Sequence, residues 1–243
     1  MAATRWERPS APPALGMDEA HIWRARLALS PHSMAEMQEL LSPDERERAS
    51  RFVFARDRER YVCARTRLRL LLGSYLGALP AELRFTYSAL GKPALETLAE
   101  GRRLCFNLAH SGELALFALT WERAIGVDVE QVRDTLPFLA LLESVFAPRE
   151  RALLLALPEE ERRRAFFTGW ARKEAYLKAR GDGLSYPLDA FEVSLLPDEA
   201  PELRLPASED APARWRLHAI NIGAEYAAAA VTEGPATLRL FDM

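Results

Sequence analysis

The order of strand-like and helix-like segments in the first half of the chain returns in the second half. In the first half, the alternating segment 21–27 precedes helical periodicity from residue 43 to residue 73 or 77, with a break expected near Asp57. In the second half, the alternating segment 125–130 precedes helical segments that end at Gly181. The helices expected there are 136–146, 148–157 and 159–180. The later strands expected are 83–87, 103–107 and 113–121, then 191–195, 214–220, 226–231 and 237–241.

This repetition predicts an α+β fold made of two similar α+β halves, because the two copies are offset by about a hundred residues, a common domain size. We place the boundary between residues 122 and 123, so that the halves are 1–122 and 123–243. A single α+β domain whose two ends resemble each other by chance is the alternative that the pattern leaves open.

Composition and charge exclude several classes of protein. The chain has 243 residues, of which 49% are hydrophobic and 28% are charged, and this is enough to bury a sizeable core. Its net charge of −3 argues against a general nucleic-acid binder. The only cysteines, Cys63 and Cys105, lie far apart, which favours reduced thiols and argues against a disulfide scaffold or a zinc finger. With neither a signal-peptide pattern nor a membrane span visible, we expect a soluble cytoplasmic protein that acts as a monomer.

Two carboxylates lie on one face of the strand expected at 125–130. Asp128 and Glu130 are two residues apart, so their Cα atoms lie about 7 Å from each other and their side chains can converge on one cation. Oxygen donors without Cys or His nearby favour Mg²⁺ or Mn²⁺ over zinc. Gly126 on the same face should leave room for a ligand. The alternative is an amphipathic edge strand that shows ordinary acids to water.

A row of unlike side chains runs along one face of the helix expected at 159–180. Trp170, Glu174 and Lys178 are spaced i, i+4, i+8, so an apolar residue, an acid and a base lie in line. Glu174 is therefore a candidate third ligand or a base, and Lys178 a candidate phosphate contact. The alternative is a solvated ion pair, which is common on helices.

Two further features favour an anionic ligand. His110 stands among small residues near the end of a strand, where a ligand can approach, although a lone histidine there is also compatible with a structural role. Arginines crowd the helical region of the first half, which suits a nucleotide phosphate or, alternatively, only keeps the helix surface soluble. These arginines are Arg46, Arg48, Arg51, Arg56, Arg58, Arg60, Arg65, Arg67 and Arg69. The glycine-rich loops of P-loop and Rossmann nucleotide sites do not occur.

Taken together, the motifs resemble those of the Sfp-type 4′-phosphopantetheinyl transferases. The resemblance covers about residues 23–230, and its five motifs occur in the family's order with matching gaps. They are Arg51-Phe52 with Asp57-Arg58, Gly91-Lys92-Pro93, Phe106-Asn107 with His110-Ser111, Gly126-x-Asp128-x-Glu130, and Trp170-x-x-Lys173-Glu174-Ala175-x-x-Lys178 with Gly181 and Gly183.

The resemblance implies a reaction and a fold. Members transfer the 4′-phosphopantetheine arm of coenzyme A to a serine of an apo acyl or peptidyl carrier protein, with Mg²⁺, and release 3′,5′-ADP. Their fold is a pseudo-dimer of two α+β halves with the active site at the seam. A binding module without catalysis and a different Mg²⁺-dependent nucleotide enzyme are the competing interpretations, and the complete set of three acids and the Gly-Lys-Pro motif argue against them.

The resemblance also implies residue roles. Asp128, Glu130 and Glu174 match the metal-binding acids, and Glu174 is the implied base for the carrier serine. The groups implied to contact coenzyme A are His110 and Lys178 at the pyrophosphate, Lys92 at the nucleotide, and Arg48 and Arg60 near the 3′-phosphate.

Two positions depart from the family pattern. Ala109 stands where many members have Ser, which implies the loss of one hydroxyl contact to coenzyme A. Glu45 stands where some members place a basic residue for the 3′-phosphate, and Arg46 or Arg48 is the expected substitute.

The segment after Glu130 is more apolar than one buried helix face requires. We predict that part of it forms an exposed patch where the carrier protein docks, and the alternative is that both faces are buried. The apolar residues are Phe138, Leu139, Leu141, Leu142, Val145 and Phe146.

Overall fold

The fold was analysed in a computed structural model, which describes residues 5–27, 33–96, 98–181, 183, 186–206 and 214–243. The helices in this part of the chain are α1 (Ser33–Glu39), α2 (Pro43–Ser50), α3 (Ala55–Leu76), α4 (Leu142–Val145), α5 (Pro148–Ala156) and α6 (Glu159–Arg180), with 3-10 turns η1 (Pro80–Glu82), η2 (Phe138–Leu141) and η4 (Leu188–Ala190). The strands are β1 (Glu19–Arg26), β2 (Phe85–Tyr87), β3 (Pro93–Leu95), β4 (Leu104–Ser111), β5 (Leu114–Trp121), β6 (Ile125–Gln131), β7 (Glu192–Val193), β8 (Leu203–Arg204), β9 (Trp215–Ala219), β10 (Tyr226–Glu233) and β11 (Thr237–Asp242).

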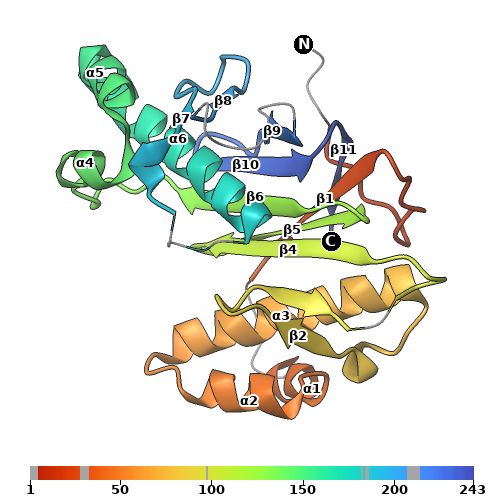
Figure 1. The fold of residues 1–243 in the computed structure, drawn as a ribbon. Helices are drawn as coiled ribbons and strands as arrows, with labels where there is room; N and C mark the ends of the chain where they lie inside the picture. The colour runs from red at the N-terminus through yellow and green to blue at the C-terminus, as the bar shows by residue number, and fades with distance from the viewer. Residues whose placement is uncertain (1–4, 28–32, 97, 182, 184–185, 207–213) are drawn as a thin grey trace.

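The elements form four layers (Figure 1). A sheet with the strand order β11-β1-β5-β4 packs on one face against α3, and a sheet with the order β6-β10-β9 packs on one face against α6. The remaining faces of the two sheets meet in a shared core that includes Ile22, Leu116, Val127 and Ala230. The predicted α+β fold with two halves is therefore confirmed.

The last strand crosses from the second half to the first. β11 pairs in parallel with β1, with Ile22 opposite Leu240, whereas β1–β5, β5–β4 and β6–β10 are antiparallel pairs. Because a parallel pair needs a long crossover, this contact has no local sequence signal, and the repeated pattern did not predict it. The division between residues 122 and 123 stays a prediction. β11 belongs to the second half by sequence, although it pairs with a strand of the first half.

Local signals define the long helices as predicted. Pro43 occupies the first helical position of α2, and the Glu45 carboxylate accepts the Ser42 backbone N–H at 3.0 Å. The expected break near Asp57 lies between α2 and α3, at residues 51–54. Gly77 ends α3 and Gly181 ends α6 in the left-handed region, with φ of 61° and 84°, where a side chain would be strained.

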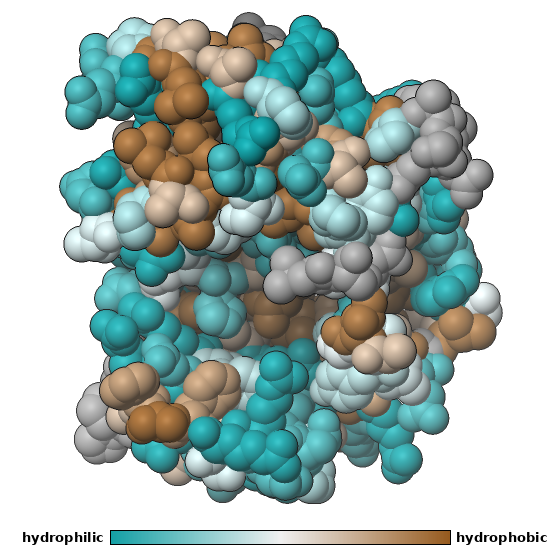
Figure 2. Space-filling model, turned by 60° about the vertical axis from the view of Figure 1, so that its left-hand side comes forward, coloured by the Kyte–Doolittle hydropathy of each residue, from teal (hydrophilic) through white to brown (hydrophobic). Residues whose placement is uncertain are grey.

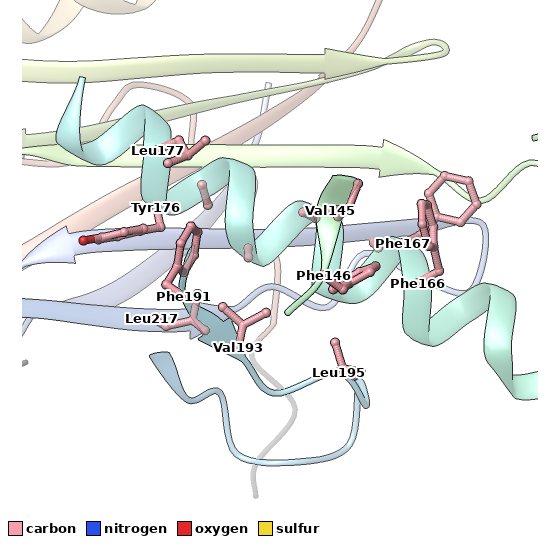
Figure 3. Packing of buried hydrophobic residues seen from close by; sticks show 14 of the residues in the cluster. Val145, Phe146, Phe166, Phe167, Tyr176, Leu177, Phe191, Val193, Leu195 and Leu217 are labelled. Atoms are coloured by element: carbon pink, nitrogen blue, oxygen red, sulfur yellow. The ribbon is translucent and has the colours of Figure 1, made fainter. Parts of the chain in front are cut away.

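The core of the second half absorbs the segment predicted to be a docking helix (Figure 3). Residues 136–146 do not form a continuous helix; they contain η2 and the single turn α4. Phe138, Leu142, Val145 and Phe146 are buried against aromatic side chains of α6, and only Leu139 is strongly exposed, at 55%. The predicted exposed patch is therefore wrong for most of its residues, because this short segment fills the core and not the surface.

Candidate active site

The strand β6 presents two different faces, as its alternation predicts. Val127 and Val129 point into the core between the sheets, whereas Asp128 points toward α6. The expectation that Gly126 leaves room for a ligand is wrong. A Cβ atom there would lie 2.1 Å from the Ala175 carbonyl oxygen and 2.3 Å from the Ala179 nitrogen, so the backbone of α6 occupies that space. Gly126 thus lets α6 approach β6 closely.

A part-buried ion pair joins β6 to α6. The Lys178 Nζ atom donates to Oδ1 of Asp128 at 2.6 Å, and Asp128 is only 3% exposed. Its other oxygen, Oδ2, is buried with no hydrogen-bond partner among the described residues. Burial raises the pKa of Asp128 although Lys178 opposes the shift. Burial also disfavours charge on Lys178, but Asp128 and then Glu174 and Glu130 outweigh it, so the Lys178 pKa is raised.

Glu130 and Glu174 lie within electrostatic reach of the same aspartate. Burial, and next the negative charge of Asp128, raise the pKa of Glu130 to about 7. The same two causes in the same order raise the pKa of Glu174, which lies half-buried on α6. Asp128 repels both glutamates, so a cation beside Asp128 would relieve part of the effect that raises their pKa values.

The donor set fits a hard cation, although the acids are not gathered around one point. Within the described ranges, no cluster of three or more Asp, Glu, His or Cys side chains is close enough to hold a metal ion. Asp128 is engaged by Lys178, and its Oδ2 atom is the buried oxygen that still lacks a partner. An unpartnered carboxylate oxygen beside two further carboxylates is the chemistry that Mg²⁺ or Mn²⁺ prefers.

Side chains of β4 connect the two halves at the site. The Asn107 Oδ1 atom accepts the Val127 backbone N–H at 2.9 Å, and the Ser111 Oγ atom accepts the Gln131 backbone N–H at 3.0 Å. The Ser111 hydroxyl also donates to Oε2 of Glu130 at 3.0 Å. β4 and β6 are edge strands of different sheets, so these bonds take the place of a backbone ladder and fix the position of the Glu130 carboxylate.

The structure brings His110 and Arg60 to this region from the first half. His110 lies on β4, one residue before Ser111, with part of its side chain open to solvent, and Arg60 is half-buried on α3. Partial burial lowers the pKa of His110, and the positive charges of Lys178 and Arg60 lower it further. His110 is therefore a neutral ring at pH 7 with two cations close by, an arrangement that suits an anionic ligand.

Arg48 lies in a separate pocket on the first half. This pocket has a volume of about 580 Å³, and the guanidinium carbon of Arg48 lies 5.7 Å from the centre of the Tyr61 ring. Arginines and aromatic rings together suit the phosphate and the base of a nucleotide. The pocket is lined by Asp44, Glu47, Arg48, Arg51, Phe52, Tyr61 and Tyr87.

Lys92 connects the first half to the end of α6. Its Nζ atom donates to the carbonyl oxygens of Lys178, Ala179 (3.1 Å) and Ile125 (3.4 Å), where the carbonyls at a helix C-terminus favour a cation. Lys92 also lines a second pocket of about 500 Å³, which shares Tyr87 with the pocket of Arg48. A hollow crosses the molecular face shown in Figure 2, between its upper and lower parts.

Known proteins match both halves of the chain. Residues 124–231 match the model of the 4′-phosphopantetheinyl transferase superfamily, and residues 27–122 match that of the N-terminal region of 4′-phosphopantetheinyl transferases. The chain is 42% identical over 195 residues to the 4′-phosphopantetheinyl transferase HetI of Nostoc sp., with 79% of this chain and 82% of HetI covered. The chain belongs to the 4′-phosphopantetheinyl transferase superfamily.

The chain is also similar to a second transferase and to a synthase of known structure. The 4′-phosphopantetheinyl transferase Sfp of Bacillus subtilis is 29% identical over 180 residues, which cover 74% of this chain and 78% of Sfp. The synthase is a holo-(acyl-carrier-protein) synthase from Bacillus anthracis, whose crystal structure was solved in complex with CoA (3′,5′-ADP). The two sequences are 25% identical, and the match covers 46% of this chain and 96% of that chain, with a TM-score of 0.38. The predicted family and the enzyme class, a phosphopantetheinyl transferase, are confirmed by the family models and the relatives.

Glu45, which departs from the pattern of the transferase family, has a structural role in this enzyme. It is 1% exposed and forms ion pairs with Arg65 and with Arg69, whose Nε atom lies 2.6 Å from Oε2. A carboxylate held between two buried arginines is not available to a ligand, and its removal would leave buried charges without a partner. Ala109, the other departure, is 4% exposed, so a serine there would be buried in the shared core.

A further buried ion pair, between Lys173 and Glu150, has no signal in the sequence pattern. Lys173 is fully buried, and its Nζ atom lies 2.7 Å from Oε2 of Glu150 and donates to the Leu188 carbonyl oxygen at 2.8 Å. The pair ties α6 to α5 and so supports the placement of Glu174, the next residue. Trp170 packs edge-on against the Phe166 ring, so it belongs to the core and not to the site.

Proposed function

We propose that this enzyme transfers the 4′-phosphopantetheine arm of coenzyme A to a serine of an apo acyl or peptidyl carrier protein, with Mg²⁺, and releases 3′,5′-ADP. The observation that carries the proposal is the seam cluster, in which the Asp128–Lys178 pair, Glu130 and Glu174 of the second half lie near His110 of the first. Phosphoryl-type transfer requires acids that can hold a cation and basic groups that can hold a phosphate.

We assign the metal to Asp128, Glu130 and Glu174. The support is the orphaned Oδ2 atom of Asp128 and the raised pKa values of all three carboxyl groups. When bound there, Mg²⁺ or Mn²⁺ would neutralise pyrophosphate charge. Ser111 holds the Glu130 carboxylate by its hydroxyl group and so orients one proposed ligand.

The reaction exchanges one phosphorus–oxygen bond for another. The serine oxygen of the carrier forms a bond to the phosphorus that bears the pantetheine arm, the bond to the bridging oxygen breaks, and 3′,5′-ADP leaves with the electron pair. We assign the serine proton to Glu174, which takes it directly or through a bound water. His110 and Lys178 donate to the pyrophosphate, where the leaving group gains charge.

The nucleotide end of coenzyme A is assigned to the first half. The pocket beside Arg48 combines arginines with the rings of Tyr61 and Tyr87, and these suit a phosphate and a purine. Arg60 lies nearer His110 and is the second proposed contact of the 3′-phosphate. Lys92 lines the adjoining pocket, and its proposed contact with the nucleotide requires the amine to leave one of the three backbone carbonyls that hold it.

We further propose that the enzyme acts as a cytoplasmic monomer whose halves are residues 1–122 and 123–243. The boundary is supported by the two family models, which match on either side of it. Cys63 and Cys105 are free thiols, as expected in a reducing compartment. In the described part of the chain, no helix combines the length and the apolar character that a membrane crossing requires.

The test is to mix the enzyme with coenzyme A, Mg²⁺ and a panel of apo carrier proteins, and to weigh the carriers by mass spectrometry. At least one carrier should gain the mass of one phosphopantetheine arm. Asp128→Asn should abolish this gain, whereas Asp134→Asn, at an acid whose side chain is 98% exposed, should preserve it. Chelation of Mg²⁺ should stop transfer, and Mn²⁺ should partly restore it.

Two outcomes would contradict the proposal. If coenzyme A binds and no carrier gains mass, this chain does not transfer the arm, and a binding module without catalysis is the better interpretation. If transfer proceeds at the wild-type rate in excess chelator, the metal assignment is wrong although the transfer reaction stands.

A further inference from the structure

The loop between α2 and α3 exposes apolar side chains to an unusual degree. Val53 is 90% exposed and Phe54 is 68% exposed, the two highest values among the large hydrophobic residues that the structure describes, and the preceding Phe52 is 36% exposed. Exposed apolar side chains that are contiguous usually mark a surface that binds a partner. We call residues 52–54 the apolar tip.

The apolar tip is held in place by its neighbours. The Phe52 ring lies 5.3 Å from the Tyr61 ring, so Phe52 anchors the loop against α3. Phe54 is the N-cap residue of α3, and its carbonyl oxygen accepts the backbone N–H groups of Asp57 and Arg58 at 3.1 Å each. Because the backbone is fixed on both sides, the tip offers a preorganised contact surface.

Arginines flank the apolar tip. Arg51 precedes it, and Arg56 and Arg58 lie in the first turn of α3; the side chains of Arg51 and Arg56 are 72% and 75% exposed. Their partners Glu47 and Asp57 are also exposed, so these ion pairs are weak and can be exchanged for pairs with another molecule. An apolar contact flanked by guanidinium groups fits a partner that presents an apolar residue among carboxylates.

The apolar tip lies beside the proposed site. Arg51 and Phe52 line the pocket that also contains Arg48. Arg60, one turn beyond Arg56 on α3, is close enough to His110 for its positive charge to lower the pKa of that ring. A molecule that rests on the tip therefore reaches toward the seam where the transfer is assigned. The only macromolecule in the proposed reaction is the protein that carries the acceptor serine.

We propose that the apolar tip and its arginines form a docking surface for an acidic face of the acceptor protein. The inference rests on the proposed function, because it names how that function's protein substrate is recognised. A second copy of this chain is a poorer occupant, since symmetric pairing of the surface would bring arginines against arginines.

The test is steady-state kinetics of Phe54→Asp and Val53→Asp with the acceptor and coenzyme A varied in turn. Asp is a preferred N-cap residue, so Phe54→Asp should not weaken α3, and neither side chain lines the nucleotide pocket. Each variant should raise the KM for the acceptor about tenfold, the effect typical of a central interface residue, and leave the KM for coenzyme A within about twofold. Leu79→Asp is the matched control, because Leu79 is 64% exposed beyond the other end of the same helix, roughly 33 Å away at 1.5 Å per residue.

Three further measurements separate the occupants. The KM for the acceptor should rise with salt. For an acceptor whose surface carboxylates are changed to amides, the difference in KM between wild type and Phe54→Asp should become smaller, because only the lost apolar contact remains. Acceptor KM values equal to those of Leu79→Asp would overturn the proposal. So would a dimer or an anionic-vesicle complex of the wild type that Phe54→Asp abolishes while the acceptor KM stays unchanged. If the wild type transfers to no acceptor, the proposed function itself fails and this inference with it.

Discussion

Replacement of Gly126 by Ala should move Lys178 away from Asp128 and so break the ion pair between them. A Cβ at this position would lie 2.1 Å from the Ala175 carbonyl oxygen and 2.9 Å from the Ala179 Cα atom. Both are backbone atoms of α6, so no flexible side chain can move aside. The helix must therefore shift outward, and it carries Lys178 away from Asp128, which lies 2.6 Å from the lysine amine.

The size of the effect follows from the contact. An overpacked core position costs typically about 1–3 kcal/mol, and backbone contacts this short belong at the upper end of that range. For a chain of this length each 1 kcal/mol lowers the Tm by about 2–4 °C, so we expect a fall of roughly 6–12 °C for Gly126→Ala. A displacement of about 1 Å at reacting groups can reduce turnover by about 100-fold, so kcat/KM should fall by about this factor even at temperatures where the variant is folded.

The assay combines thermal unfolding by circular dichroism with the kcat/KM for carrier modification at a temperature where both proteins are folded. Gly77→Ala is the control: a Cβ there meets nothing within 4 Å, and the variant bears only the strain of a left-handed residue, about 1 kcal/mol. The control should lose a few degrees of Tm and keep its activity. A Gly126→Ala enzyme with the Tm and kcat/KM of the wild type would refute the close contact between α6 and β6.

Three other expectations concern metal binding, the nucleotide and pH. Burial and Asp128 raise the pKa of Glu130 to about 7, so the affinity for Mn²⁺, measured by electron paramagnetic resonance, should rise as the pH passes from 6 to 8. Ser111→Ala should lower the Mn²⁺ affinity about 10-fold, and Ser111→Thr should restore it. Arg48→Ala should raise the KM for coenzyme A far more than it raises the KM for dephospho-coenzyme A, and equal rises for both substrates would show that Arg48 does not contact the 3′-phosphate. Burial lowers the pKa of His218 from 6.5 to about 4, so the folded state favours the neutral ring, and stability should be complete above pH 6.5 and fall as the pH drops toward 4. His218→Gln should flatten that part of the Tm–pH curve, and an unchanged slope would contradict the assignment.

Sequence patterns predicted what depends on neighbours along the chain. The alternation of β6, the capping box at Ser42 and the glycine that ends α6 each involve residues within one or two turns, and all three occur as expected. The sequence also singled out Asp128 and Lys178 as candidate site residues, and the fold brings them into contact across 50 residues. Their pairing was not foreseen, because helical and strand periodicities give the face of each element and not its partner.

The failures come from packing between distant elements. Gly126 looks like a space for a ligand in one strand, and only the position of α6 shows that backbone fills the space. The leucines and phenylalanines of residues 136–146 look excessive for one helix face, whereas in the folded protein Phe138 and Phe146 serve the core of the whole second half. Glu45 looks like a lost ligand contact until its pairing with Arg65 and Arg69 is seen.

The geometry of the candidate site depends on contacts between two sheets that share no backbone ladder. Asp128 belongs to β6 of the second half, and His110 belongs to β4 of the first. The edges of these strands are joined by Asn107 and Ser111, whose side chains accept backbone N–H groups of β6 four residues apart. A side-chain hydrogen bond can be lost by one substitution, whereas a ladder loses one bond among many. Each of these two residues therefore affects the distance between the acids proposed to bind the metal and the base proposed to bind the phosphate more than its own contribution to stability would indicate.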